Sequence, residues 1–185
     1  MITFRYGGYF GVMPASLDPG SYYHVYNRAV GGEDLFREPR NYAFFLERYA
    51  HHVAPAVGTL AYCLMPNHFH LVIRVREVED EGGRAEDALI RKPVRSPRPD
   101  RFGSRASPTL SRRFANLFAS YAKAVNKAWD RSGALFERPF RRIRVDDARY
   151  LATLIRYVHR NPVHHGFVAD LADWPHSSYH ALLDR

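Results

Sequence analysis

The chain has 185 residues, of which 46% are hydrophobic and 25% charged, proportions that indicate one globular domain and exclude a wholly disordered chain. The single cysteine, Cys63, excludes an intrachain disulfide and a cysteine-rich zinc site, and it favours the reducing cytoplasm. No apolar run approaches the roughly 18 residues that span a membrane. The formal net charge of +8, from 27 Lys and Arg against 19 Asp and Glu, favours a nucleic acid as partner.

The first half of the chain contains four elements after a leader without a clear period. Residues 1–20 mix glycine, proline and aromatic residues, and we interpret them as a flexible N-terminal arm. Alternating Tyr and Val predict a strand over Ser21–Arg28, and apolar residues at helical spacing predict an amphipathic helix over Pro39–Val53. Two apolar runs separated by Pro-Asn, Thr59–Met65 and His68–Val75, predict a hairpin of two strands.

The second half begins with a segment of different composition. Residues 78–106 are rich in arginine, glycine and proline and poor in large apolar residues, which predicts a mobile basic insertion. A helix is expected over Pro108–Asp130, ending before Gly133. A strand is expected over Ala134–Val145, and a further helix over Asp146–Arg160, which Asn161-Pro162 would end.

This order of elements predicts the class of fold. Strand, helix, strand, strand, helix, strand and helix indicate an α+β protein with an antiparallel sheet backed by helices, for which a ferredoxin-like layout is the simplest match. We expect one domain over residues 21–179 and a short tail over residues 180–185.

Two histidines on one predicted strand form the sharpest local feature. Side chains alternate across a strand, so His68 and His70 share a face while Phe69 points into the core. Two imidazoles about 6.5–7 Å apart along the strand can lean toward one metal ion, which would need a third protein ligand. The alternative is a pair of surface histidines or a core histidine with a satisfied N–H.

The helix that follows the insertion carries a tyrosine with two interpretations. Tyr121 lies on the apolar stripe of this helix, which is typical of a core tyrosine with its hydroxyl at the rim. The functional alternative is a phenol that reaches a histidine-bound metal and acts as a nucleophile. Asn126, just over one turn further, offers an amide oxygen as a third ligand, or is a surface or capping amide.

Basic residues with interleaved aromatics predict a nucleic-acid surface, although a solvated basic face is the alternative. Phe136 and Phe140 lie within the basic stretch from Arg131 to Arg144. The arginines expected to contact DNA are Arg28, Arg131, Arg138, Arg141, Arg142 and Arg144.

Four stretches together resemble one known family. They are YHVYNR at Tyr23–Arg28, LMPNHFHLVI at Leu64–Ile73, YAKAVNKAWDRSGALFERPFRR at Tyr121–Arg142, and YLATLIRYVHRNPVHHGFV at Tyr150–Val168. In these the chain is similar to the REP-associated tyrosine transposases, relatives of the small single-tyrosine (HUH) insertion-sequence transposases. The resemblance covers nearly all of residues 21–179, and the pairing of MPNHFH with RYVHRNPV makes it specific.

The resemblance implies a ferredoxin-like nuclease fold and a metal-dependent reaction on single-stranded or hairpin DNA. Carried over by motif, His68 and His70 would bind Mg²⁺ or Mn²⁺, and Tyr121 would form a 5′-phosphotyrosine and leave a 3′-OH. Relatives place a polar residue four positions after the tyrosine; Val125 stands there, so Asn126 at five becomes the expected third ligand. Members of this branch are expected to act as monomers.

Two other functions are consistent with the same residues. A non-catalytic protein that binds DNA hairpins, such as a domesticated regulator, would bind tightly without cleaving. A small RNA-binding domain would stack bases on sheet aromatics, but a polar histidine pair on the sheet argues against it.

Overall fold

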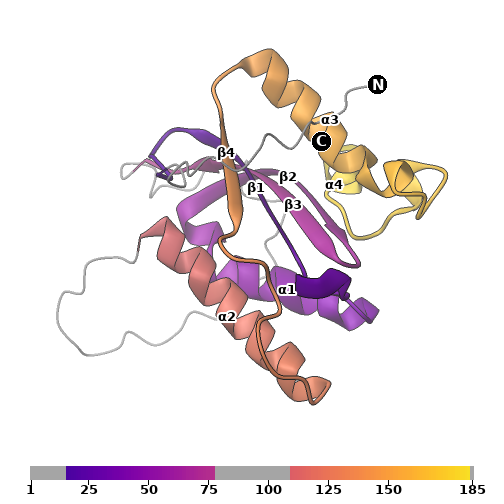
Figure 1. Ribbon diagram of the computed structural model, residues 1–185. Coiled ribbons are helices and arrows are strands. Elements are labelled where there is room, and N and C mark those ends of the chain that lie inside the picture. Colours follow the sequence, from indigo (N-terminus) through magenta and orange to yellow (C-terminus); the bar gives the residue numbers. More distant parts are fainter. Residues whose placement is uncertain (1–15, 78–108, 184–185) are drawn as a thin grey trace.

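A four-stranded antiparallel sheet forms the centre of the molecule (Figure 1). The computed structural model describes residues 16–77 and 109–183. The spatial order of the strands is β2-β3-β1-β4, and every neighbouring pair is antiparallel. The strands are β1 (Tyr22–Arg28), β2 (Val57–Met65), β3 (His68–Val75) and β4 (Arg141–Val145).

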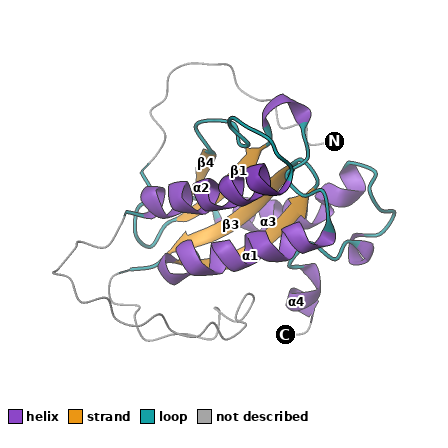
Figure 2. Ribbon diagram, turned by 90° about the horizontal axis from the view of Figure 1, so that it is seen from below, coloured by secondary structure: helices purple, strands orange, loops and turns teal. Residues whose placement is uncertain are grey.

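Helices cover both faces of the sheet. α1 (Pro39–His52) and α2 (Leu110–Ala128) lie side by side on one face, and α3 (Ala148–His164) lies on the other (Figures 1 and 2). The short α4 (Tyr179–Leu183) follows near the C-terminal end. With the chain order β1-α1-β2-β3-α2-β4, this is the ferredoxin-like α+β layout that the sequence predicted.

The alternation of side chains along β3 separates two apolar cores. Phe69, Leu71 and Ile73 point toward α1 and α2 and belong to the larger core. Val72 points the other way and packs with Val158 of α3 in a smaller core. Each face of the sheet therefore buries its own set of residues, and the two sets meet different helices.

Two predicted elements differ from the structure. The expected strand over Ala134–Val145 is regular only over Arg141–Val145, because the residues before it form a loop in which Phe136 makes a single bridge to Ala29. The last long helix does not stop at Asn161-Pro162: α3 continues to His164 with Pro162 inside it. The Asn161 side-chain amide donates to Val158 O at 3.4 Å, the carbonyl whose backbone donor Pro162 lacks.

The predicted insertion at 78–106 and most of the predicted arm at 1–20 lie outside the described residues, so the proposed domain limits stay predictions. Within the described part of the chain, no helix is both long and apolar enough to cross a membrane.

A C-terminal segment, residues 176–178, is hydrogen-bonded along the outer edge of β2. Leu64 N donates to His176 O at 2.9 Å, and Ser178 N donates to Tyr62 O at 3.0 Å. The buried Ser178 hydroxyl accepts from Tyr62 N at 2.8 Å and lies 2.8 Å from Nε2 of His159 on α3. Ser178 therefore joins the edge strand, α3 and the C-terminal segment at one point.

Ser178→Ala is expected to lower the free energy of unfolding by about 1–3 kcal/mol, because it leaves buried polar groups of Tyr62 and His159 without this partner. Urea unfolding measures the loss. Ser120→Ala is the matched control, since the Ser120 hydroxyl donates only within its own helix, to Leu117 O, and a change within about 0.5 kcal/mol is expected. Equal losses in the two variants would contradict this role of Ser178.

Candidate functional site

The face of the sheet that α3 covers gathers three histidines from two neighbouring strands. In the β1–β3 register, Tyr26 lies opposite His70 and Arg28 lies opposite His68, so these four side chains share a face. His24, two residues before Tyr26 on β1, points the same way, and its ring stacks at 5.0 Å from that of His70. The two predicted metal ligands therefore lie in a cluster of imidazoles and not on an open surface.

A hydrogen bond between two buried imidazoles fixes the position of His70. His24 Nε2 and His70 Nδ1 are 2.9 Å apart, and both side chains are only 6% exposed. Burial lowers the pKa of His24 to about 4 and the pKa of His70 well below its usual value. Both rings are neutral at pH 7, and Nε2 of His70 is the ring nitrogen that this bond leaves for a ligand.

His68 is held in the same manner by a different partner. Its Nδ1 lies 2.6 Å from Asn67 Oδ1, an atom that only accepts, so Nδ1 carries the proton and Nε2 has the lone pair. Burial lowers the pKa of His68 to about 4, with smaller contributions from His165 and Arg28. The rings of His68 and His70 are 5.3 Å apart between centroids.

One stripe of α3 lies across from this histidine pair. The ring of Tyr157 is 5.9 Å from the ring of His70, and the ring of His165, which follows the helix, is 5.0 Å from that of His68. Asn161 stands midway between Tyr157 and His165, and residues four apart share a face of a helix. Tyr157 and Asn161 therefore face the two histidines, and Tyr157 is partly exposed.

The donor set fits a divalent cation with three protein ligands. No cluster of three or more His, Cys, Asp or Glu side chains suited to a metal exists among the residues that the structure describes, so a third ligand would come from another residue type. Asn161 is 1% exposed, and its amide nitrogen donates to Tyr157 O at 2.9 Å and to Val158 O. These bonds employ the nitrogen and leave the amide oxygen as the group to face an ion, as Mg²⁺ and Mn²⁺ prefer.

The structure contradicts the expectation that the Tyr121 hydroxyl reaches the histidine pair. Tyr121 lies in α2 on the opposite face of the sheet, 0% exposed, and its hydroxyl donates to Leu35 O at 2.7 Å. The rings of Phe36 and Phe45 pack against it at 5.8 and 5.2 Å. Burial raises the pKa of Tyr121 far above its usual value. Tyr121 is a core residue, the other interpretation of its position on the apolar stripe.

Asn126 also lies on the wrong side of the sheet for a metal ligand. Its amide nitrogen donates to Gly133 O at 3.0 Å, and its oxygen accepts from Arg131 Nη1 at 2.6 Å. These bonds tie the end of α2 to the loop that follows. Asn126 thus has the capping role that the sequence left open.

The register of β1 and β4 divides the predicted DNA-binding arginines between the two faces. Arg141 lies opposite Tyr26, so it shares the face of the histidines and is exposed at the edge of the sheet. Arg28, on the same face beside His68, forms an exposed ion pair with Glu137 at 3.6 Å. These two arginines border the candidate site.

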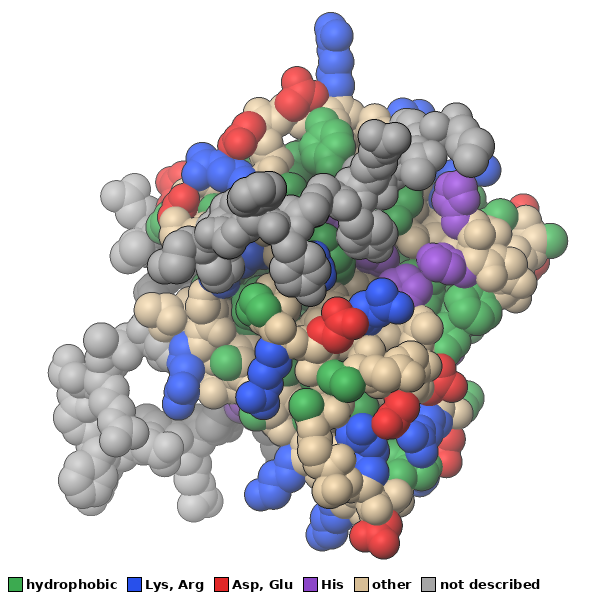
Figure 3. Space-filling model, viewed as in Figure 1, with side chains coloured by type: hydrophobic (Ala, Val, Ile, Leu, Met, Phe, Trp, Pro, Cys, Tyr) green, Lys and Arg blue, Asp and Glu red, His purple; other side chains and the backbone are tan. Residues whose placement is uncertain are grey.

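The other predicted arginines lie elsewhere. Arg142 points toward α2, where it donates to Ser111 Oγ at 2.7 Å. Arg144 pairs with Asp146 at 2.7 Å and Asp18 at 3.0 Å, and Arg131 pairs with Glu33. Arg138 is exposed in the loop before β4. In Figure 3 basic side chains are scattered over the surface around α2, whereas histidines gather nearer the C-terminal part.

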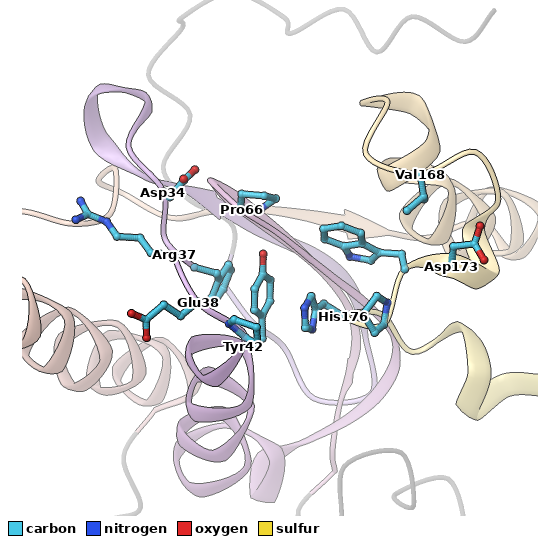
Figure 4. A pocket seen from close by; sticks show the side chains of 12 residues that line it. Asp34, Arg37, Glu38, Tyr42, Pro66, Val168, Asp173 and His176 are labelled. Atoms are coloured by element: carbon cyan, nitrogen blue, oxygen red, sulfur yellow. The ribbon is translucent and has the colours of Figure 1, made fainter.

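A pocket of about 450 Å³ lies beyond the β2–β3 turn and is separate from the histidine cluster. Figure 4 shows Tyr42 and His176 side by side in it, and their rings stack at 3.6 Å. The carboxylates of Asp34, Glu38 and Asp173 line its walls, which makes it unsuited to a phosphate backbone. The face that carries Arg28 and Arg141 is therefore the better candidate for DNA.

Comparison with known proteins confirms the resemblance that the motifs indicated. Over 122 residues, 66% of this chain, the sequence is 28% identical to a protein of Haemophilus influenzae named REP-associated tyrosine transposase, and the matched segment spans 58% of that relative's length. The chain is thus similar to the REP-associated tyrosine transposases. No family model matches it.

A solved structure shares the fold. It is the structure of a REP-associated tyrosine transposase bound to a REP hairpin, with a TM-score of 0.66 and 14% sequence identity, and the alignment covers 95% of this chain and 87% of that one. At this identity the likeness concerns the arrangement of sheet and helices.

Sequence reasoning missed Tyr157 and Asn161, although a signal for both was present. The motif RYVHRNPV is specific to the resemblance, and in it Asn161 stands four residues after Tyr157. This is the spacing of tyrosine and polar residue expected of the relatives, and Tyr121 lacks it. The expectation that α3 ends at Asn161-Pro162 hid the fact that both residues lie in one continuous helix.

Acidification is expected to destabilise the fold through the buried histidines. Burial lowers the folded-state pKa values of His24 and His68 from the ordinary 6.5 to about 4, so the folded state disfavours their protonation. The contribution of these two neutral histidines to stability is fully present above pH 6.5 and is lost as the pH drops toward 4. Melting temperatures measured between pH 4 and 7 test this expectation. His24→Gln should flatten the dependence of the melting temperature on pH, and an unchanged dependence would contradict the contribution of His24.

Tyr121→Phe is expected to lower the free energy of unfolding by about 1–3 kcal/mol, because Leu35 O loses its buried donor while the ring packing remains. Urea unfolding measures this loss. Stability equal to that of the wild type would contradict the buried placement of the Tyr121 hydroxyl.

Proposed function

We propose that this protein cleaves and rejoins single-stranded DNA next to hairpins, using Tyr157 as the nucleophile and a divalent cation, Mg²⁺ or Mn²⁺, held by His68, His70 and Asn161. The observation that carries the proposal is the position of Tyr157, whose ring lies 5.9 Å from that of His70 on the face where both histidines point. The similarity to REP-associated tyrosine transposases supports the same chemistry.

The reaction would proceed by transfer of a phosphodiester to the phenol. The Tyr157 oxygen attacks the scissile phosphorus, the new O–P bond forms, and the bond from phosphorus to the 3′ oxygen breaks. The phenol loses its proton and the 3′ oxygen gains one, which leaves a 5′-phosphotyrosine and a 3′-OH. Rejoining is the reverse attack by a 3′-OH, and it needs no nucleotide cofactor because the phosphotyrosine retains the phosphodiester.

The histidines of the site would bind the cation, and the arginines would bind the DNA backbone. His68 and His70 are neutral at pH 7 because burial lowers their pKa values, so their ring nitrogens are available as ligands. A bound divalent cation would neutralise charge that develops on the scissile phosphate. Arg28 and Arg141, on the same face, would hold the flanking backbone.

Hairpin DNA is the proposed partner. The solved relative of the same fold is bound to a REP hairpin, and the net charge of +8 suits a polyanion. Because Tyr157 and the histidine pair come from one chain, the site is complete within a monomer, which we propose as the working unit.

Tyr157→Phe is expected to abolish the covalent adduct between the protein and a labelled hairpin oligonucleotide in the presence of Mn²⁺, because no other hydroxyl replaces the phenol. Denaturing gel electrophoresis measures the adduct. Tyr150→Phe, in the same helix, is the matched control, and Tyr121→Phe should also retain the adduct below its melting temperature.

Two outcomes would contradict the proposal. An adduct that persists in Tyr157→Phe would exclude this nucleophile. Hairpin binding by the wild type without any adduct would instead favour a non-catalytic protein that binds DNA hairpins.

A further inference from the structure

His24 contacts His70 but has no role in the reaction described above. His24 lies on β1, and its buried ring contacts those of Tyr26, at 4.8 Å, and His70, at 5.0 Å. Its Nε2 is 2.9 Å from His70 Nδ1. A buried polar side chain that contacts a proposed metal ligand directly is positioned to control that ligand.

We propose that His24 is a positioning residue that fixes the tautomer and the ring orientation of His70, and so presents the bare Nε2 of His70 to the cation. This inference rests on the proposed function in one respect, that His70 is a ligand. His24 would not bind the cation itself, because its Nε2 is used by His70.

The positions of the protons on the two rings decide which nitrogen of His70 can bind a cation. One proton lies between His24 Nε2 and His70 Nδ1, and at neutral pH each ring carries a single N–H. If His70 donates, its proton is on Nδ1, its Nε2 has a lone pair, and His24 must carry its own proton on Nδ1. In the reverse arrangement His70 Nε2 carries the proton and cannot bind a cation. Only the first arrangement makes His70 a ligand.

The tautomer of His68 is fixed more firmly than the tautomer of His70. His68 Nδ1 faces Asn67 Oδ1, which only accepts, so the tautomer of His68 is set by its partner alone. His70 faces another imidazole, which is able to donate or to accept. The tautomer of His70 therefore depends on His24, and a change at His24 should reach the metal through this bond.

The first experiment measures Mn²⁺ binding to the full chain without DNA, by isothermal titration calorimetry. His24→Phe keeps an aromatic ring but removes the acceptor, and the dissociation constant is expected to rise about 10–100-fold. His24→Gln places an amide oxygen where Nε2 of His24 lies, and it is expected to keep the affinity within a few-fold of the wild type. A merely structural role would not separate these two variants in this way.

The second experiment needs no variant. Nitrogen-15 NMR of histidine-labelled wild-type protein without metal is expected to show His70 protonated on Nδ1 and bare on Nε2, and His24 bare on Nε2. The opposite tautomers would overturn the inference, as would equal Mn²⁺ affinity in the wild type and His24→Phe. A wild-type protein that binds no Mn²⁺ would overturn the proposed metal site and this inference with it, so the two failures are distinguishable.

Discussion

The alternation of side chains across the pleated sheet is the constraint on which the rest of the structure depends. On β3, Phe69 points toward α1 and α2, while His68 and His70 on either side of it point toward α3. Pairing with β1 holds this register, and a slip of one residue would exchange the apolar and polar faces. Burial of Phe69 in the larger core therefore also directs both imidazoles to the opposite side.

The same alternation explains which parts of the site could be predicted from the sequence. The pattern of HFHLVIRV is local, so the strand, the shared face of His68 and His70 and the inward position of Phe69 all followed from it. The face on which a helix lies depends on the path of the chain and not on the helix's own pattern. Both α2 and α3 are amphipathic, and periodicity alone did not distinguish the helix that meets the histidines.

The structure separates the two tyrosines by the face of the sheet on which each lies. Tyr121 shares a stripe with Phe118, whose ring lies 5.9 Å from that of Phe69, and Phe69 points away from the histidines. A tyrosine on the stripe that meets Phe69 cannot also meet His70, because the sheet lies between them. Tyr157 shares a face with Asn161, which signals a polar contact. The continuation of α3 beyond Pro162 is a tertiary effect, in which the Asn161 amide donates to Val158 O.

The most direct test of this account is to identify the tyrosine that becomes linked to DNA. After reaction with a hairpin oligonucleotide and Mn²⁺, digestion with nuclease and trypsin should release the nucleotide on the peptide Tyr157–Arg160. Mass spectrometry that finds the modification there would agree with the placement of α3 over the histidines. A nucleotide on the peptide Phe114–Lys123, which contains Tyr121, would contradict the separation of the two faces.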